Sequence, residues 1–331
     1  MGRMPSTITH TYFTQDVLEK LPISVRELLI DEKDMLKIYG QSMDVLFFYN
    51  ITNLRKGKRI RQFGHYFHEH QTQEFFINLI NYIKYNRYGY MPSVMAFLYG
   101  MICHYVLDST IHPYVIYKTG IYEKDDLKTY SYKQRHEHME TFLDNYLLLQ
   151  REGKKPYRIK SHHFCFAIKP LTKEVQEVMD YSFKETFDIN HMSKFYTKAL
   201  RQMRFFFRYF RTDRLGVKKK FYCLLDHLTP KNAYQLEVLS YHIDPIDQWN
   251  YLNWNKQEWN HPTNLKEKYN HSFVELYMIA ISKAVKLIEE VNQYIYEDKK
   301  ISLKKLFPDL SYVSGKKCNS KKTLQYFEKK C

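Results

Sequence analysis

The chain has few of the residues that make turns or covalent cross-links. Its 331 residues include only ten glycines, ten prolines and five cysteines. β-Sandwiches and barrels need many turn residues, so this scarcity favours helices over a set of short strands. The cysteines are odd in number and none form a C-x-x-C pair, which favours free thiols in a reducing compartment over a disulfide framework.

No long apolar run and no signal peptide are visible in the sequence. No run approaches the roughly 18 apolar residues that a membrane span needs. The first residues, MGRMPSTITHTYF, contain no apolar signal segment. We therefore expect a cytoplasmic protein, with any contact to membranes restricted to their surface.

Aromatic residues and positive charge are abundant. Hydrophobic residues make up 44% of the chain, which includes 30 Tyr and 22 Phe, and this composition excludes global disorder. The formal net charge of +15 favours anionic partners, namely phospholipid surfaces, nucleic acid or phosphorylated substrates. The charge does not choose among these partners, and simple solubility explains it equally well.

Helical periodicity runs through most of the chain. It predicts helices at 42–49, 59–86, 92–112, 133–149, 172–186, 191–211 and 264–296, with a loop at 152–168. Pro92 suits the first turn of its helix, whereas Pro113 should end or kink that helix. The tail from Glu297 holds ten lysines, and we expect it to be partly irregular and solvated. Together these patterns predict an all-α fold.

Three polar residues stand on one apolar helix face. The stretch ICHYVLDSTIHPYV (102–115) places His104, Asp108 and His112 at steps of four, within the apolar arc of the helix predicted at 92–112. A buried carboxylate without a partner is strongly unfavourable. Carboxylate and neutral imidazole are both suited to zinc, so a metal ion is one remedy. A hydrogen-bonded His–Asp pair is the other.

A second helix repeats the feature. In RHEHMETFLDNYLLL (135–149), His136 and Glu140 lie four residues apart on the apolar stripe, over one spot of the helix surface. Glu137 and His138 point to the far side, where we expect them to be solvated. Geometry alone therefore separates His136 from its neighbouring histidine.

Three further candidates precede these in the chain. His68 leads the apolar stripe of the helix predicted at 59–86, and His65, about 60° away around the helix, stays a rival. Asp44 is an acid among apolar residues shortly after Gly40, and His10 heads the first amphipathic stripe. Burying so many polar groups without compensation would be prohibitive, so the pattern predicts binding of more than one metal ion.

In this order the residues resemble the zinc-dependent phospholipase C family, whose relatives include single-strand-specific zinc nucleases. The family pattern is an early His, Gly-x-x-x-Asp, an isolated His, His-x-x-x-Asp with a His soon after, and His-x-x-x-Glu. Over about residues 4–150 the chain offers His10, Gly40 with Asp44, His68, His104 with Asp108, His112, and His136 with Glu140. The resemblance implies an all-α fold with a zinc cluster at the base of a cleft.

The resemblance also implies how these residues share the metal. One Zn²⁺ would be held by Asp44, His68, His104 and Asp108, and a second by His112, His136 and Glu140, with Asp108 able to bridge. His10 would belong to a third site. The N-terminal Trp that completes this site in the secreted enzymes has no counterpart, because the first Trp here is Trp249. We expect two zinc ions and leave the third open.

The implied function is phospholipase C-like hydrolysis of a phosphodiester by a metal-activated water, which Asp44 would align or deprotonate. The expected substrate is a phospholipid or another phosphodiester, with an anionic membrane surface as a further candidate partner and nucleic acid less favoured. The alternatives are a single-strand nuclease of the same fold and a non-catalytic, metal-stabilised protein that binds membrane surfaces. No G-x-S-x-G, P-loop or G-x-G-x-x-G motif competes with this assignment.

The organisation that we expect is a single multi-helix domain. Residues 1–150 would form its metal-binding helical core, and residues 151–331 a helical C-terminal part that completes the same domain, with a basic tail from about residue 297. The stretch KALRQMRFFFRYFRTDRLGVKKK (198–220) interleaves arginines with aromatic residues and suits anionic lipid or phosphate. We favour a half-buried helix with a solvated basic face, because aromatic residues at this spacing usually pack inward.

Overall fold

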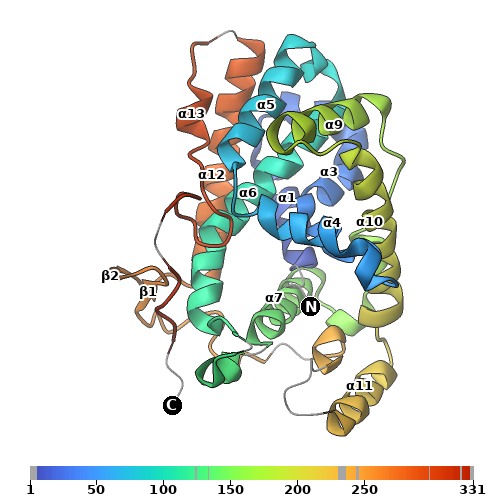
Figure 1. Ribbon diagram of the computed structural model, residues 1–331, viewed down its shortest axis with the longest axis vertical. Coiled ribbons are helices and arrows are strands. Elements are labelled where there is room, and N and C mark those ends of the chain that lie inside the picture. The colour runs from blue at the N-terminus through green and yellow to red at the C-terminus, as the bar shows by residue number, and fades with distance from the viewer. Residues whose placement is uncertain are drawn as a thin grey trace.

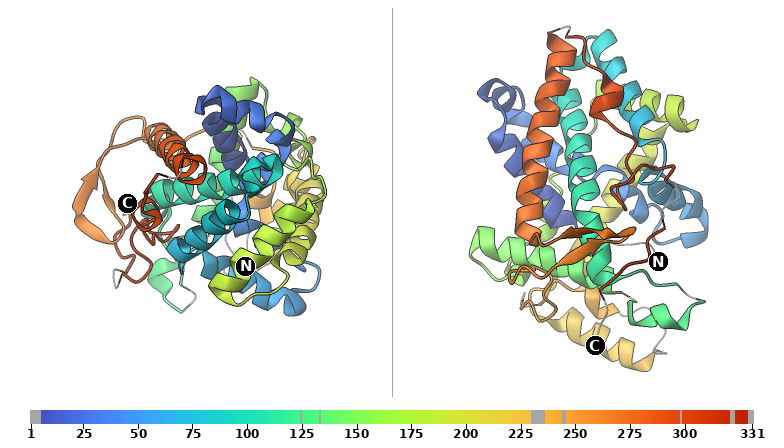
Figure 2. Two further views of the ribbon diagram at one scale, coloured as in Figure 1. Left: turned by 90° about the horizontal axis from the view of Figure 1, so that it is seen from above. Right: turned by 90° about the vertical axis from the view of Figure 1, so that its left-hand side faces the viewer.

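One long helix, α6 (Pro92–Thr119), forms the centre of the fold (Figure 1). The computed structural model describes residues 6–123, 125–132, 134–229, 236–243, 246–297, 299–320 and 323–328. The helix α12 (Phe273–Tyr296) runs alongside α6 (Figure 2), and α1 (Thr7–Lys20), α3 (Lys33–Tyr39), α7 (Arg135–Glu152) and α9 (Lys173–Phe187) also contact it. Among the described helices, α6 alone is long and apolar enough to cross a membrane, yet 89% of its apolar window is buried inside the fold.

The remaining elements surround this centre, and most of them are helical. In chain order they are α2 (Ile23–Leu28), η1 (Ile30–Glu32), η2 (Ser42–Phe48), α4 (Leu54–Phe67), α5 (Thr72–Tyr85), η3 (Tyr88–Tyr90), η4 (Leu127–Tyr132), η5 (Pro156–Arg158), α8 (Ser161–Phe164), α10 (Met192–Phe206), η6 (Phe207–Arg211), α11 (Val217–Leu228), η7 (Leu236–Leu239), β1 (Trp259–His261), β2 (Asn264–Tyr269) and α13 (Leu303–Leu306). Within the described residues, β1 and β2 form the one sheet, an antiparallel pair. The prediction of an all-α fold is confirmed.

The prediction of one helix over 59–86 is wrong, because the chain breaks between α4 and α5. Gln71 adopts a left-handed conformation with φ of 54°. At the start of α5, just after this break, Asp309 accepts hydrogen bonds from the Thr72 hydroxyl at 3.0 Å and the Gln73 backbone N–H at 3.2 Å. A carboxylate at this position satisfies donors that a helix start leaves unpaired. The break leaves His68 as the C-terminal cap of α4.

Of the two predicted effects of Pro113, an end or a kink, the end is wrong. The helix α6 continues to Thr119. Proline removes the N–H that would bond the carbonyl of Ser109, four residues earlier. That carbonyl faces Gly315 of the C-terminal tail, where an added Cβ would lie within 2.4 Å of the Ser109 oxygen. The tail itself is less solvated than expected, since both Phe307 and Tyr312 are fully buried.

Other predicted boundaries differ from those in the structure. Residues 264–269 form strand β2 rather than the start of a helix, and α12 begins at Phe273 behind a capping box made by Ser272 and Glu275. The apolar segment at 42–49 is the 3₁₀ helix η2, and the loop at 152–168 contains the short helices η5 and α8. In 198–220, Phe207 packs inward as favoured, but Phe205, Tyr209 and Phe210 are exposed.

The end of α3 approaches α6 closely because both carry glycine at the contact. A Cβ on Gly100 would lie 2.5 Å from the Cβ of Tyr39 and 2.8 Å from the backbone nitrogen of Gly40. A Cβ on Gly40 would lie 2.4 Å from the Thr14 methyl of α1. Glycine at both positions therefore lets α1, α3 and α6 meet, and this brings the carbonyl of Gly40 against α6.

Gly100→Ala should lower the free energy of unfolding by about 1–3 kcal/mol, because the new methyl group must push α3 away from α6. Chemical denaturation measures the change, with Lys286→Ala as a control on α12, where the lysine side chain is 77% exposed. Helix propensity alone would make Gly100→Ala stabilising. An unfolding free energy equal to or above that of the parent chain would therefore contradict the close approach.

Candidate metal centre

The predicted ligands lie on α6 itself and on four elements that meet its middle. His10 comes from α1, Asp44 from η2 and His68 from the end of α4, while α7 supplies His136 and Glu140. With His104, Asp108 and His112 of α6 they form three groups whose ligand atoms lie within 4.8 Å of one another: His10 with His104 and Asp108, Asp44 with His68 and His104, and His112 with His136 and Glu140. All are buried except His112, which is partly exposed.

Backbone carbonyls fix the orientation of three imidazoles. The Nδ1 atoms of His68, His104 and His112 lie 2.6, 3.0 and 3.0 Å from the carbonyl oxygens of Gly64, Gly40 and Tyr312 respectively. A carbonyl oxygen only accepts, so each Nδ1 carries a proton and donates it. In the neutral ring, Nε2 then presents a lone pair. Histidines that bind metals are commonly held by such a bond from the other ring nitrogen.

His104 shows most clearly that acceptors face each other inside the protein. Burial, only partly offset by Asp108, lowers the pKa of His104, so this imidazole is neutral. Its Nε2 lone pair lies 3.1 Å from Oδ2 of Asp108 and 3.3 Å from Nε2 of His68. Oδ2 of Asp108 is buried and accepts no hydrogen bond from any described residue. Acceptors this close to one another need a cation between them, which is either a metal ion or a proton on His68, whose pKa Asp44 and Asp108 raise against the effect of burial.

The carboxylates of the centre stay ionised despite their burial. Burial alone would raise the pKa of Asp108, but His112, His104 and His10 outweigh it and hold the pKa well below its usual range. Burial of Asp44 is likewise outweighed, chiefly by His104 and His68, and its pKa is lowered. Protonation of the carboxylates therefore does not relieve the crowding of acceptors. The donor set of imidazole nitrogens and carboxylate oxygens fits zinc.

The third group continues the arrangement toward α7. Oε1 of Glu140 lies 3.0 Å from Nε2 of His136 and 3.8 Å from Nε2 of His112, and Oε2 of Glu140 is buried without a described partner. Burial raises the pKa of Glu140, but His136 and His112 lower it overall. Asp108 connects this group to the others, because its Oδ2 lies 3.6 Å from Nδ1 of His112.

His10 joins the centre through the second oxygen of Asp108. Its Nε2 lies 3.2 Å from Oδ1 of Asp108, and its ring stacks on that of His104 with the centroids 4.4 Å apart. Nδ1 of His10 is buried and has no hydrogen-bond partner in the described structure. His10 thus lies beside the first α6 ligands rather than at a separate place. A third ion there stays a prediction.

The structure separates His68 from its rival His65. His65 is exposed and stacks on Phe47 with the ring centroids 4.4 Å apart, and it is in none of the three groups. His138 also lies outside them, as expected, but it is not fully solvated. Its Nδ1 is 3.2 Å from the hydroxyl of Tyr251 and the residue is half-buried. Glu137 is likewise half-buried.

Sequence reasoning missed Asp144, which positions the helix that carries His10. Oδ1 of Asp144 accepts hydrogen bonds from the Thr9 backbone N–H at 2.8 Å and from the hydroxyls of Thr9 and Ser6, each at 2.9 Å. The carboxylate therefore ties the start of α1 to α7. A signal for it exists in the sequence, since Asp144 continues the four-residue spacing of His136 and Glu140.

Sequence reasoning also missed Tyr312 in the C-terminal tail. Its backbone N–H donates to the carbonyl of His68 at 2.8 Å, and its own carbonyl accepts from His112. Its ring lies edge-on to His68, with the centroids 5.1 Å apart, and close to His104. The hydroxyl is buried and finds no hydrogen-bond partner among the described residues. Local periodicity gives no signal for this contact, because the tail is far away in sequence.

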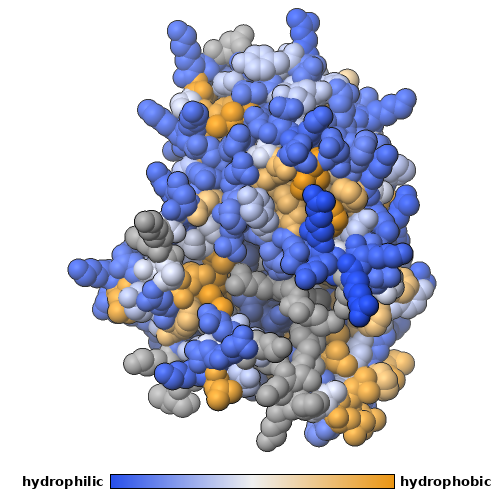
Figure 3. Space-filling model, in the orientation of Figure 1, coloured by the Kyte–Doolittle hydropathy of each residue, from blue (hydrophilic) through white to orange (hydrophobic). Residues whose placement is uncertain are grey.

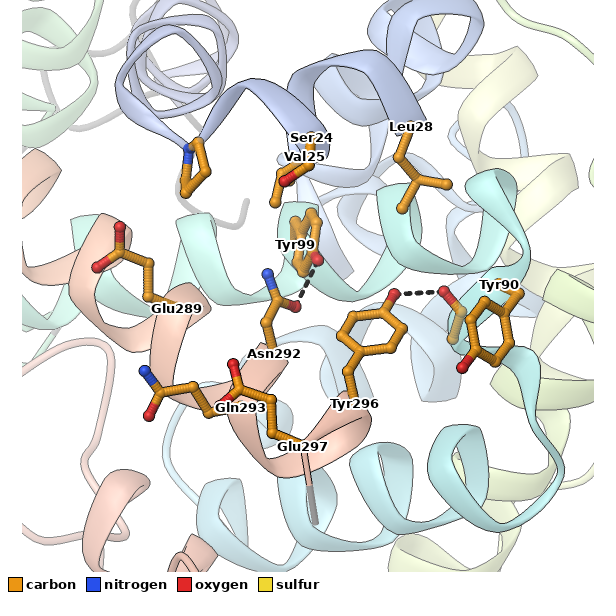
Figure 4. A pocket seen from close by; sticks show the side chains of 12 residues that line it. Ser24, Val25, Leu28, Tyr90, Tyr99, Glu289, Asn292, Gln293, Tyr296 and Glu297 are labelled. Atoms are coloured by element: carbon orange, nitrogen blue, oxygen red, sulfur yellow. Dashed lines mark hydrogen bonds between the residues drawn. The ribbon is translucent and has the colours of Figure 1, made fainter. Parts of the chain in front are cut away.

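A pocket of about 600 Å³ lies elsewhere, toward the start of α6, where α2, η3 and α12 meet (Figure 4). Two of its hydroxyls bond to other lining groups: that of Tyr99 donates to Asn292 at 2.6 Å and that of Tyr296 to the carbonyl of Gly89. None of the candidate ligands lines it. We therefore place no part of the metal centre there.

Comparison with known protein families agrees with the geometry. Residues 9–193, more than half of the chain, match the family described as zinc-dependent phospholipase C. The chain belongs to this family. The matched segment includes every candidate ligand from His10 to Glu140 and extends beyond the resemblance seen in the sequence. No curated protein and no solved structure matches the chain.

His68→Ala should remove bound zinc, whereas His65→Ala should not. The two histidines lie near the end of the same helix, but only His68 has its Nε2 among the other acceptors. Elemental analysis after dialysis should show less zinc per chain in His68→Ala, because loss of one ligand weakens the site by at least about tenfold. Equal zinc content in the two variants would contradict the placement of His68.

Tyr312→Ala should lower the free energy of unfolding by about 3–5 kcal/mol, because it empties a fully buried aromatic site. Tyr312→Phe should cost little or be stabilising, since it removes only a buried hydroxyl that has no described partner. Urea denaturation of the pair measures both effects. If the phenylalanine variant loses as much stability as the alanine variant, the hydroxyl takes part in a stabilising hydrogen bond and the prediction is wrong.

Proposed function

We propose that the chain is a metal-dependent phosphodiester hydrolase of the phospholipase C type that uses two or three zinc ions. The observation that carries the proposal is the convergence of imidazole nitrogens and ionised carboxylates at Asp108, with one carboxylate oxygen buried and unpaired among the described residues. Membership of the zinc-dependent phospholipase C family supports the same assignment.

The ligands that we propose follow the groups around Asp108. Asp44, His68, His104 and Asp108 would hold one zinc, and His112, His136 and Glu140 a second, with Asp108 shared and His10 available for a third. Bound zinc would supply a nucleophilic water near neutral pH and positive charge for the oxygens of the phosphodiester.

The chain's own residues prepare the site for this chemistry. The carbonyls of Gly40, Gly64 and Tyr312 hold three imidazoles in one orientation, so the ligands need little rearrangement. We assign Asp44 to orienting the attacking water by accepting a hydrogen bond. Its lowered pKa keeps it ionised, which makes it a better acceptor than a general base.

The substrate would reach the centre from the side of α7. The His112 side chain is 17% exposed and that of His136 is 10% exposed, whereas that of His104 is completely buried. A phosphodiester can therefore meet the centre where His112 and His136 border the solvent. A phospholipid is the substrate that the family favours, and the net charge of +15 suits an anionic phosphoester. A cytoplasmic location stays a prediction.

The test is a phosphodiesterase screen of the purified chain with and without a chelator. Substrates are a water-soluble short-chain phosphatidylcholine, an aryl phosphodiester and single-stranded DNA. We expect hydrolysis of the lipid, with loss of activity on chelation and its return with zinc. His104→Ala should reduce the rate by roughly a hundredfold or more, because it removes a ligand shared by two of the groups. His70→Ala, an exposed histidine outside the groups, is the matched control.

The outcomes separate the candidate functions. Hydrolysis of DNA but not of the lipid would replace the proposed activity with that of a nuclease. Zinc binding without turnover of any phosphodiester would point to a non-catalytic protein. Wild-type activity in His104→Ala would refute the proposed centre itself.

A further inference from the structure

Helix α11 presents its apolar side to solvent and its polar side to the protein. Val217, Phe221, Leu224 and Leu228 are between 54% and 75% exposed. At about 100° per residue they share an arc of roughly 60°, so they form one stripe. A surface helix normally turns such a stripe toward the core. The apolar side of α11 therefore faces away from the core, which is the reverse of the usual orientation.

Contacts on the opposite side of α11 fix this orientation. Asp226 accepts hydrogen bonds from the backbone N–H groups of Leu236 and Glu237 at 2.7 and 2.9 Å, which attaches the helix to η7. The buried Tyr222 donates its hydroxyl to the carbonyl of Phe210 at 3.1 Å. These bonds hold the polar side inward, so the apolar stripe cannot rotate into the core without breaking them.

The segment before α11, from the end of α10 through η6, exposes further apolar side chains. Phe205, Tyr209, Phe210 and Leu215 are 38–80% exposed, and the rings of Phe205 and Tyr209 lie 4.6 Å apart. We call this surface the α11 patch, which consists of Phe205, Tyr209, Phe210, Leu215, Val217, Phe221, Leu224 and Leu228. Figure 3 shows apolar side chains gathered at the end of the molecule where α11 lies (Figure 1). Apolar surface collected in this way marks an interaction site.

The charges around the patch identify the kind of partner. Positive side chains alternate with these apolar residues along the sequence: Arg201, Arg208, Arg214 and Lys220 are exposed, and Arg204 and Lys219 are half-exposed. The acids of the segment are committed to internal bonds. Asp213 is buried and accepts from the Lys218 and Lys219 backbone N–H groups and the Ser240 hydroxyl, while Asp226 bonds to η7. The patch therefore combines an apolar surface with a positive rim.

We propose that the α11 patch docks on anionic lipid bilayers, with its aliphatic and aromatic side chains in the acyl region and its Arg and Lys at the phosphates. A helix with an apolar face and basic flanks lies in the plane of a membrane interface in this way. A second copy of the chain fits less well, because it would bring the positive rims together. Nucleic acid fits less well too, since the side chains of Leu215, Val217, Leu224 and Leu228 neither stack on bases nor bond to them.

This inference does not rest on the proposed hydrolase activity, because docking needs neither the metal centre nor turnover. Binding is therefore measured by sedimentation of the full chain with vesicles. One set of vesicles is phosphatidylcholine alone, and the other is equal parts of phosphatidylcholine and phosphatidylserine. We expect binding to the mixed vesicles, weakened by salt, and much weaker binding to phosphatidylcholine alone.

Paired variants test the surface itself. Leu224→Ser with Leu228→Ser should weaken binding to the mixed vesicles by roughly tenfold or more, because two side chains lose their place in the acyl region. The control pair is Ile23→Ser with Leu127→Ser, whose side chains are about as exposed but lie outside the patch. The control pair should bind as the parent chain does. Arg214→Glu with Lys220→Glu should also weaken binding and reduce its salt dependence.

The proposal is overturned if the patch and control pairs bind vesicles equally, or if phosphatidylserine makes no difference. It is also overturned if the Leu224 and Leu228 substitutions instead abolish self-association or the binding of single-stranded DNA. A chain that binds vesicles but hydrolyses no phosphodiester would support docking and refute the proposed function. A chain that hydrolyses soluble substrates but ignores vesicles would do the reverse.

Discussion

The structure depends on lone pairs that face one another where water cannot reach them. Nε2 of His104, Nε2 of His68 and Oδ2 of Asp108 lie within 3.1–4.0 Å of each other inside the core. Removing a charged group from water costs several kcal/mol in real proteins unless a partner replaces the lost solvation. The carbonyls of Gly40 and Gly64 accept the Nδ1 protons of His104 and His68, so Nε2 of each ring faces the carboxylates. A metal ion between these atoms would replace the protons that the carboxylates otherwise favour on His68 and His10, whose pKa values they raise against the effect of burial. Helices α1, α3, α4 and α7 all begin or end beside this centre. The packing of these helices therefore depends on what compensates the buried polar groups of the centre.

The residues of the centre could be predicted from the sequence because helix geometry is local. Four-residue spacing places His104 and Asp108, or His136 and Glu140, on one face of a helix, and this does not depend on the tertiary structure. Position on the apolar stripe was likewise enough to favour His68 over His65, and the structure separates them in the same way. The all-α class followed from the same periodicity and from the scarcity of turn residues.

The features that could not be predicted are set by contacts between distant parts of the chain. Asp309 accepts hydrogen bonds from the start of α5, beyond the break after His68, yet nothing near residue 71 signals this distant partner. Gly315 lies against the carbonyl that Pro113 leaves without its usual partner, and α6 continues to Thr119, past the point where a local rule predicts an end or a kink. Periodicity also gives the stripe on α11 but not the direction that it faces. That direction is set by Asp226 and Tyr222, through bonds to residues outside the helix.

The measurement that tests the central claim most directly is a calorimetric titration of zinc into the metal-depleted chain, followed by thermal unfolding. If the facing acceptors exist because cations bind between them, the chain should take up at least two equivalents of zinc. Its unfolding temperature should then rise, since an ion that binds only the folded state stabilises it. A folded chain that takes up no zinc and unfolds at the same temperature with and without it would contradict the claim.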